Sequence, residues 1–180
     1  LGGTGPFEKS GAYPDLRSIV ALQQETLHLI VLPSSKISSV NDFRGKRINI
    51  GSKDSGSRVT GETLLRTIGV TIDDLAFVGE LEPFEQVNAF CNGELDAIIW
   101  MAAVPNQLAT ELTSRCQGVL LNIPDAVTLK MTSEKSSLVP QTLPGGIYPG
   151  NPQQTNSVGA FASLMVDSSM ASEKVQIIAS

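Results

Sequence analysis

Strand-like and helix-like segments alternate along almost the whole of this 180-residue chain. Short apolar runs predict strands, and apolar residues at helical spacing predict helices. The strands are expected at 16–21, 27–32, 47–51, 95–101, 119–123 and 158–166, and the helices at about 57–68, 84–92, 105–113, 124–135 and 172–179. Alternation of this kind indicates an α/β fold with a mostly parallel sheet that helices cover on both faces.

The same alternation predicts where a ligand would bind. Ligands of such sheets bind beyond the carboxyl ends of the strands, where loops lead into helix N-termini. Three passages qualify: 51–58, 101–106 and the loop around Tyr148. We expect the helices that begin near Ser57 and near Pro105 to point their N-termini at one shared cleft, which requires both to lie on the same face of the sheet.

The first passage favours an anion. Its glycines and small hydroxyl residues leave backbone N–H groups accessible in front of a helix N-terminus, which carries about half a positive charge. Ser55, Gly56, Ser57 and Arg58 are therefore candidate ligands for a carboxylate, with Arg58 as a bidentate partner or, alternatively, paired with Glu62. A nucleotide phosphate loop is rejected, because the Lys-Ser/Thr pair of that motif is absent. A plain helix cap at Ser55 or Ser57 is the other interpretation.

The other two passages offer candidate walls for a binding cleft. The second passage follows directly on Trp100, and its small and polar residues leave room for a ligand at a second helix N-terminus. These residues are Ala103, Val104, Pro105 and Asn106. Tyr148 lies on a Gly/Pro loop and offers a flat apolar face and a hydroxyl. Core packing of Trp100 and surface packing of Tyr148 are the alternatives.

Composition excludes several other classes of function. The chain carries 13 Lys+Arg against 18 Asp+Glu, a net charge of −5, whereas a nucleic-acid surface needs clustered basic residues. One histidine and two cysteines without metal-ligand spacing give no metal site. His28 lies in an apolar strand and is expected to be a packed or surface-facing residue, although a catalytic triad could use it. Cys91 is expected to be a buried free thiol, with a disulfide to Cys116 as the alternative.

Four segments together resemble one known family. They are 43–51, 55–58, 92–97 and 146–150, with sequences FRGKRINIG, SGSR, NGELDA and GIYPG. They resemble the TAXI family, the extracytoplasmic solute receptors of tripartite ATP-independent periplasmic (TRAP) transporters, over about residues 16–179. The resemblance implies a type II periplasmic-binding-protein-like fold with one complete lobe, at 46–123, and part of a second. Residues 1–45 and 124–180 would form that partial lobe, the hinge and the C-terminal segments, and the family's N-terminal stretch would be missing.

The resemblance also implies a function. The chain would bind a small carboxylate, such as glutamate or a related organic acid, deliver it to a TRAP permease in the membrane, and act outside the cytoplasm without cofactor or covalent chemistry. Ser55 to Arg58 would hold the carboxylate, Asn106 would meet polar groups, and Trp100 and Tyr148 would wall the cleft. Two departures from the family are Ser57 in place of threonine and Ala103-Val104-Pro105 in place of Gly-Tyr-Pro. The effector-binding domain of a transcription regulator, or a transferase of the same two-lobed fold, is the alternative.

Overall fold

The computed structural model describes residues 13–179, which divide into two units. The larger unit comprises residues 25–160, and the smaller one comprises 13–24 together with 161–179. Both long strands, β1 (Leu16–Val31) and β7 (Thr155–Asp167), run from one unit into the other. The two units are described separately below.

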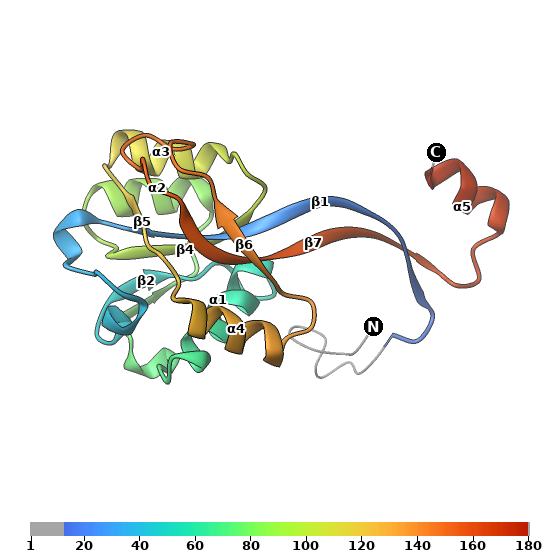
Figure 1. Cartoon of the computed structure of the whole chain (residues 1–180), viewed down its shortest axis with the longest axis horizontal. Coiled ribbons are helices and arrows are strands. Elements are labelled where there is room, and N and C mark those ends of the chain that lie inside the picture. The colour runs from blue at the N-terminus through green and yellow to red at the C-terminus, as the bar shows by residue number, and fades with distance from the viewer. Residues whose placement is uncertain (1–12, 180) are drawn as a thin grey trace. The chain divides into compact units, whose positions relative to one another are not determined.

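The described strands form a mixed sheet rather than the mostly parallel one expected (Figure 1). Besides β1 and β7 they are β2 (Arg47–Asn49), β3 (Phe77–Gly79), β4 (Ala97–Ala102), β5 (Val119–Leu120) and β6 (Val139–Leu143). Their order is β3-β2-β4-β1-β7-β6, with β5 beside β1. β2 runs parallel to β3 and β4, whereas β1 runs antiparallel to β4 and β5. Between β1 and β2 only short 3-10 turns occur, at Pro33–Ser35 and Val40–Phe43, so no helical crossover returns the chain in the same direction.

Helices cover both faces of the sheet, as predicted. α1 (Gly56–Thr67) and α4 (Asp125–Glu134) pack on one face, and α2 (Pro83–Cys91) and α3 (Gln107–Arg115) pack on the other (Figure 1). Neighbouring residues of β4 show the division, because side chains alternate along a strand. Ile99 belongs to the cluster under α1 and α4, and Ile98 to the cluster under α2 and α3.

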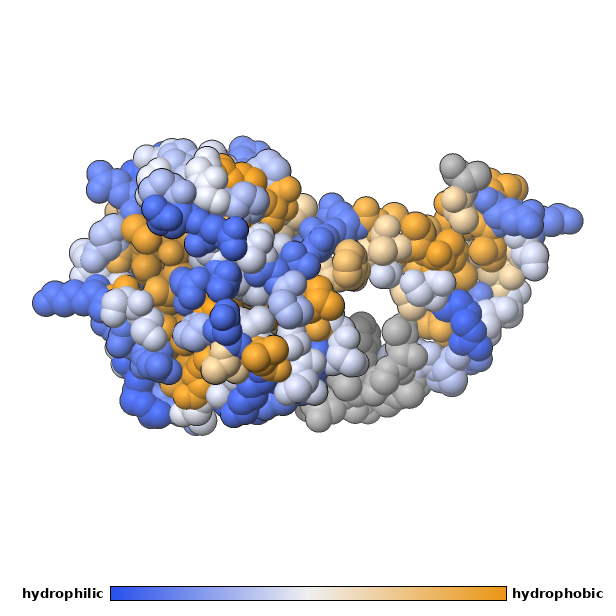
Figure 2. Space-filling model, viewed as in Figure 1, coloured by the Kyte–Doolittle hydropathy of each residue, from blue (hydrophilic) through white to orange (hydrophobic). Residues whose placement is uncertain are grey.

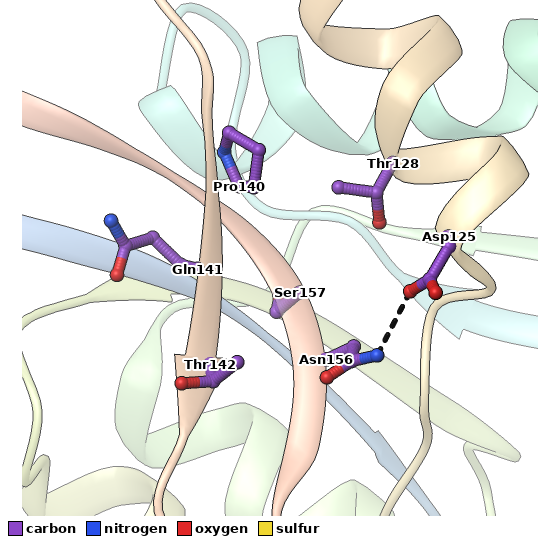
Figure 3. A pocket seen from close by; sticks show the side chains of 7 residues that line it. All are labelled: Asp125, Thr128, Pro140, Gln141, Thr142, Asn156 and Ser157. Atoms are coloured by element: carbon purple, nitrogen blue, oxygen red, sulfur yellow. Dashed lines mark hydrogen bonds between the residues drawn. The ribbon is translucent and has the colours of Figure 1, made fainter.

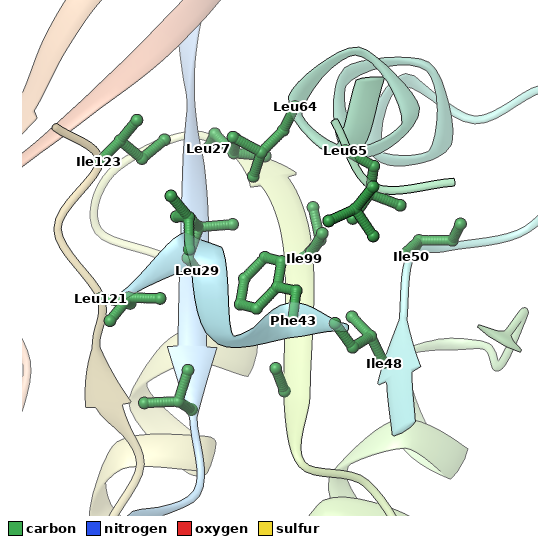
Figure 4. Packing of buried hydrophobic residues seen from close by; sticks show 14 of the residues in the cluster. Leu27, Leu29, Phe43, Ile48, Ile50, Leu64, Leu65, Ile99, Leu121 and Ile123 are labelled. Carbon is green, nitrogen blue, oxygen red and sulfur yellow. The ribbon is translucent and has the colours of Figure 1, made fainter. Parts of the chain in front are cut away.

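The core under α1 and α4 is built from large aliphatic side chains around one aromatic ring. Phe43 is fully buried among Leu29, Ile48 and Ile99 on the sheet and Leu64 and Leu65 of α1 (Figure 4). Complete burial of an aliphatic or aromatic side chain contributes about 1.5–3 kcal/mol. The first strand of the candidate site, β2, is therefore held in place by its own buried residue, Ile48.

Three strand predictions differ from the structure, and the first difference is β3, which was not among the expected strands. The expected strands 16–21 and 27–32 are one continuous strand, β1, because the polar residues between them keep the strand conformation. β6 was not predicted. Pro140, Gln141 and Thr142 interrupt its apolar pattern, and it lies at the end of the strand order, where proline is tolerated. The larger unit consequently extends beyond 46–123, and the lobe boundaries implied by the resemblance stay a prediction.

The interpretation of Cys91 as a buried free thiol is wrong. Cys91, the last residue of α2, is exposed and forms a disulfide with Cys116, whose Cα lies 4.8 Å away at the end of α3. The apolar residues Phe84, Val87, Phe90 and Cys91 recur at helical spacing and predicted one buried face, but Phe84 and Cys91 are seven residues apart and share a direction that faces solvent. Val87 and Phe90 alone of the four pattern residues are buried.

The smaller unit contains the first residues of β1, the last residues of β7 and helix α5 (Ser172–Ala179). Among its described residues, Val166 is the buried hydrophobic side chain. Val20, Leu22, Phe161 and Ile177 are exposed, and Figure 2 shows hydrophobic side chains gathered on the surface of this unit. The described part of this unit therefore has almost no core of its own.

Candidate functional site

The candidate site lies at the carboxyl ends of β2 and β4. These strands are parallel neighbours, with Asn49 opposite Ile98, so the loops that follow them leave the sheet at the same edge. The loop after β2 leads into α1 and the loop after β4 leads into α3. The first and second predicted passages are thus both at this edge.

Two hydrogen bonds and one close approach of the backbone shape the start of α1. The Ser55 hydroxyl caps the helix by accepting from the Arg58 N–H at 3.1 Å, which confirms one of the two cap interpretations. The Ser57 hydroxyl accepts from the Met101 N–H at 2.9 Å and ties the helix start to β4. Gly51 has φ +88°, and a Cβ there would lie 2.8 Å from the Ser55 oxygen, so only glycine permits this approach.

Backbone N–H groups are the free donors of this passage. The first N–H groups of a helix have no partner within it. In α1 these belong to Gly56, which is exposed, and to Ser57, whose side chain is buried. The partial positive charge of the helix N-terminus lies behind them. This arrangement can bind an anion at Gly56 through the backbone.

Arg58 is not free to grip a ligand. Its side chain is only 14% exposed and forms ion pairs with Glu62 at 2.5 Å and Glu80 at 2.8 Å. The pairing with Glu62 is the alternative given by the sequence. Glu80 was missed, because it lies 22 positions away and meets Arg58 only through the fold. Arg58 thus joins α1 to the segment that follows β3.

The second passage is a helix start of similar design. Asn106 caps α3 by accepting from the Ala109 N–H at 3.3 Å, and it follows a cis Val104–Pro105 peptide bond. Trp100 is partly buried against the α2 and α3 cluster, in keeping with core packing. Its indole N–H is buried and has no partner among the described residues.

Tyr148 is buried rather than exposed in a cleft wall. It is 1% exposed, and its hydroxyl accepts from the Asn106 N–H at 2.9 Å. The same hydroxyl lies 2.8 Å from His28 Nε2, and His28 Nδ1 lies 2.9 Å from the Thr26 carbonyl. A carbonyl only accepts, so Nδ1 carries the proton and Nε2 accepts from the tyrosine. A chain of hydrogen bonds thus connects β1 to the start of α3.

The electrostatics of His28 follow from its burial. The side chain is fully buried, and desolvation lowers its pKa from 6.5 to about 4, although the hydrogen bond to Thr26 acts in the opposite direction. Burial likewise raises the pKa of Tyr148. Both groups are therefore neutral at pH 7. His28 is a packed residue, as predicted, and its contact with Tyr148 gives it a positioning role at α3.

The expectation of one shared cleft is wrong. α1 and α3 lie on opposite faces of the sheet, as the two core clusters show. Their starts meet the same strand end, because Ser57 contacts Met101 and Asn106 follows Ala102 of β4. The sequence patterns located both helix starts within two residues but did not contain the direction in which each loop leaves the sheet.

A further exposed residue at this edge was missed. Phe84, at the second position of α2, is 78% exposed and follows the carboxyl end of β3. Its place in an apolar helical pattern predicted burial, so no sequence signal distinguished it from Val87. Behind it, the fully buried Asn49 side chain accepts from the Leu81 N–H at 2.8 Å and donates to Gln86 at 2.7 Å, which fixes the loop between β3 and α2.

Comparison with known proteins places this architecture in a family. A model of the NMT1-like family matches residues 1–179. The chain belongs to the NMT1-like family. Its fold is similar to that of the periplasmic aliphatic sulphonate binding protein SsuA from Escherichia coli, with 18% identity over 81% of this chain and 38% of that one, at a TM-score of 0.50. A periplasmic binding protein from Brucella ovis with glutathione bound is 10% identical over 92% of this chain and 40% of its own chain, at a TM-score of 0.52.

These similarities establish the fold, which is that of periplasmic solute-binding proteins. A TRAP solute binding protein from Rhodoferax ferrireducens with bound malonate matches at a TM-score of 0.40, which is too low to decide between transporter classes. The chain spans about 40% of the length of the structures that it matches. In the part of the chain that the structure describes, no helix is long and apolar enough to cross a membrane, and no three His, Cys, Asp or Glu residues are grouped so that they could hold a metal ion.

Proposed function

We propose that this chain is part of a solute-binding receptor that captures a small carboxylate and delivers it to a membrane transporter without changing it chemically. The observation that carries this proposal is the start of α1, where Gly56, an exposed residue at the first helical position, lies at the carboxyl edge of the sheet beside the Ser55 cap. A helix N-terminus there favours an anion. The sulphonate bound by the E. coli relative is also an anion.

The proposal assigns different roles to the predicted site residues. Gly56 and Ser57 hold the carboxylate mainly through their backbone N–H groups, and Ser55 contributes through its hydroxyl, because its own N–H donates to the Ser52 carbonyl at 3.1 Å. Arg58 adds positive potential but stays paired with Glu62 and Glu80. Glutamate or a related organic acid is the proposed ligand, and a TRAP-type permease is the proposed partner, because segments 92–97 and 146–150 resemble the TAXI receptors.

An extracytoplasmic location is part of the same proposal. The disulfide between Cys91 and Cys116 supports it, because disulfides persist in oxidising compartments such as the periplasm and are rare in the cytosol. A receptor that collects solutes for import works in such a compartment. Alkylation of the protein isolated from periplasm should therefore find both thiols blocked.

Substitution of Gly56 tests the carboxylate site. Gly56→Pro removes the exposed N–H, yet proline is favoured at the first helical position, and Ser55 already has the extended conformation (φ −76°, ψ 154°) that a following proline requires. We expect calorimetric affinity for L-glutamate or succinate to fall about tenfold or more, the contribution of one hydrogen bond to a charged group. The melting temperature should stay close to that of the unmodified chain.

The matched control is Gly56→Ala, which keeps the N–H. A Cβ at this position meets nothing within 4 Å, so the variant should fold and bind as the unmodified chain does. Equal affinity of the proline and alanine variants would show that the Gly56 N–H does not contact the ligand. If neither they nor the unmodified chain bind any carboxylate, the proposed ligand class is wrong.

Arg58→Ala separates stability from binding. We expect the loss of two ion pairs to lower the free energy of unfolding by about 1 kcal/mol, or the melting temperature by about 3 °C, because both glutamates are partly exposed. Carboxylate affinity should change by less than about threefold, since α1 retains its N–H donors. A large loss of affinity with an unchanged melting temperature would instead make Arg58 a direct ligand contact.

A further inference from the structure

The C-terminal end of helix α2 carries the single Asn-Gly pair of the chain, Asn92 and Gly93. Asn92 is exposed to water, and its side-chain amide makes a long hydrogen bond to Glu94 Oε1, at 3.4 Å. Glycine has no Cβ to shield its backbone nitrogen, so this nitrogen can approach the side-chain amide of the residue before it. The pair is therefore a place at which the chain can modify itself.

The Gly93 nitrogen is occupied while the helix end is closed. Gly93 has φ +73°, and its N–H donates to the Phe90 carbonyl at 3.0 Å. The Glu94 N–H donates to the Ala89 carbonyl at 2.8 Å, which completes the hydrogen-bond pattern of a Schellman motif. Asn92 itself keeps a nearly helical conformation (φ −80°, ψ −2°). The glycine nitrogen reaches the Asn92 side chain only after this turn opens and its hydrogen bond breaks.

The disulfide restrains the same turn. Cys91 is the last residue of α2 and directly precedes Asn92, and its partner Cys116 is the C-cap of α3. The two Cα atoms are 4.8 Å apart, so the end of α2 is fastened to the neighbouring helix. Helix ends open locally at a lower free energy than the whole protein unfolds. A covalent link one residue away disfavours this opening, because it limits the conformations of the open turn.

We propose that Asn92 deamidates spontaneously and that the Cys91–Cys116 disulfide sets the rate. The Gly93 nitrogen gives its proton to hydroxide and forms a bond with Asn92 Cγ. The side-chain nitrogen takes a proton from water and leaves as ammonia. Water then breaks one of the two C–N bonds of the resulting succinimide ring, which yields aspartate or isoaspartate. The reaction consumes water, releases ammonia and changes no oxidation state.

The product weakens the helix end at which it forms. A carboxylate in place of the Asn92 amide puts a negative charge at the C-terminal end of α2, where the helix dipole is already negative. It also replaces the hydrogen bond to Glu94 by a contact between like charges. This site is independent of the proposed carboxylate site, because α2 begins after the carboxyl end of β3 and Asn92 lies at the other end of the helix.

Peptide mapping of aged protein tests the proposal. The full chain is kept at pH 8 in an oxidised, a phosphine-reduced and a urea-unfolded form, and mass spectrometry follows aspartate and isoaspartate at residue 92. The oxidised folded chain should react about tenfold or more slowly than the unfolded chain, since two backbone hydrogen bonds close its helix end. The reduced chain under native conditions should react at least about threefold faster than the oxidised one.

Asn156 provides an internal control for global unfolding. It precedes Ser157 in strand β7, which pairs with β6, and its side-chain amide donates to Asp125 at 2.9 Å (Figure 3). Its modification in the folded chain should be slow and should not change on reduction, because the disulfide does not restrain this strand. Acceleration of Asn92 and Asn156 by the same factor on reduction would assign the effect to global unfolding and overturn the role of the disulfide.

Asn92→Gln is the matched variant. It keeps the amide but lengthens the side chain by a methylene, which disfavours ring closure with the Gly93 nitrogen. The variant should accumulate no modified residue 92 in the folded oxidised or reduced form over the time in which the unmodified chain reacts. Less modification at Asn92 than at Asn156 in the folded chain would overturn the site. Equal Asn92 rates in the oxidised and reduced chains would overturn the control by the disulfide.

Discussion

Acidification from pH 7 to pH 4.5 should lower the free energy of unfolding by about 2–3 kcal/mol through His28 alone. The pKa of His28 is about 4 in the folded chain, whereas the ordinary value of 6.5 applies in the unfolded chain. The unfolded chain therefore binds a proton in this range that the folded chain does not. Stability from neutral His28 is complete above about pH 6.5 and is lost progressively as the pH falls toward 4.

The sequence makes this prediction easy to isolate, because His28 is the single histidine. Hydrogen bonds from Ser38, Thr71 and Ser169 lower the pKa values of Asp42, Asp74 and Asp167, so these carboxyls release their stabilisation only below the ordinary aspartate range. Urea unfolding at pH 7, 5.5 and 4.5 should show the loss in the unmodified chain. His28→Gln, which does not titrate, should be less stable at pH 7 but nearly independent of pH over this interval.

The structural consequence of protonation reaches the candidate site. Protonated His28 carries a hydrogen on Nε2 and can no longer accept from the Tyr148 hydroxyl, whose oxygen also accepts from the Asn106 N–H. The bond between His28 and Tyr148 must then reverse, and the buried tyrosine proton beside the start of α3 loses its acceptor. The same pH dependence in His28→Gln as in the unmodified chain would place the acid-sensitive group elsewhere and make the hydrogen-bond chain irrelevant to stability.

Local features were predictable from the sequence because their causes are local. The start of α1 follows from a serine cap and a glycine, whereas Pro105, which was expected in the first turn of α3, precedes the helix, and its cap Asn106 was not predicted. The burial of His28 agrees with one of the two positions, packed or surface-facing, that its apolar strand allowed. Non-local partners were not predictable: Tyr148 lies 120 residues from His28 and Glu80 lies 22 from Arg58, and neither spacing leaves a periodic pattern.

Strand direction was also beyond the sequence patterns. Alternating strands and helices predict a parallel sheet only if each strand returns through a helical crossover. β1 enters the sheet without one and lies antiparallel to β4, with Thr26 opposite Ala102. The helix faces depend on similar information, so α1 and α3 were both assigned to one cleft although they lie on opposite faces.

Reduction of the Cys91–Cys116 disulfide should lower the free energy of unfolding by about 3 kcal/mol, because the bond closes a 25-residue loop in the unfolded chain. Urea unfolding with and without a phosphine reductant measures this loss. The double variant Cys91→Ser/Cys116→Ser should match the reduced chain and should not respond to the reductant. That insensitivity excludes a general effect of the reductant on the protein.

Carboxylate binding should survive the same treatment under native conditions. The disulfide joins the C-terminal ends of α2 and α3, whereas the proposed carboxylate contacts are at the N-terminal end of α1, which lies on the opposite face of the sheet. The bond therefore contributes to stability without positioning the ligand. If the reduced and oxidised chains unfold at the same urea concentration, the two helix ends are held by packing alone, and the disulfide does not contribute to stability.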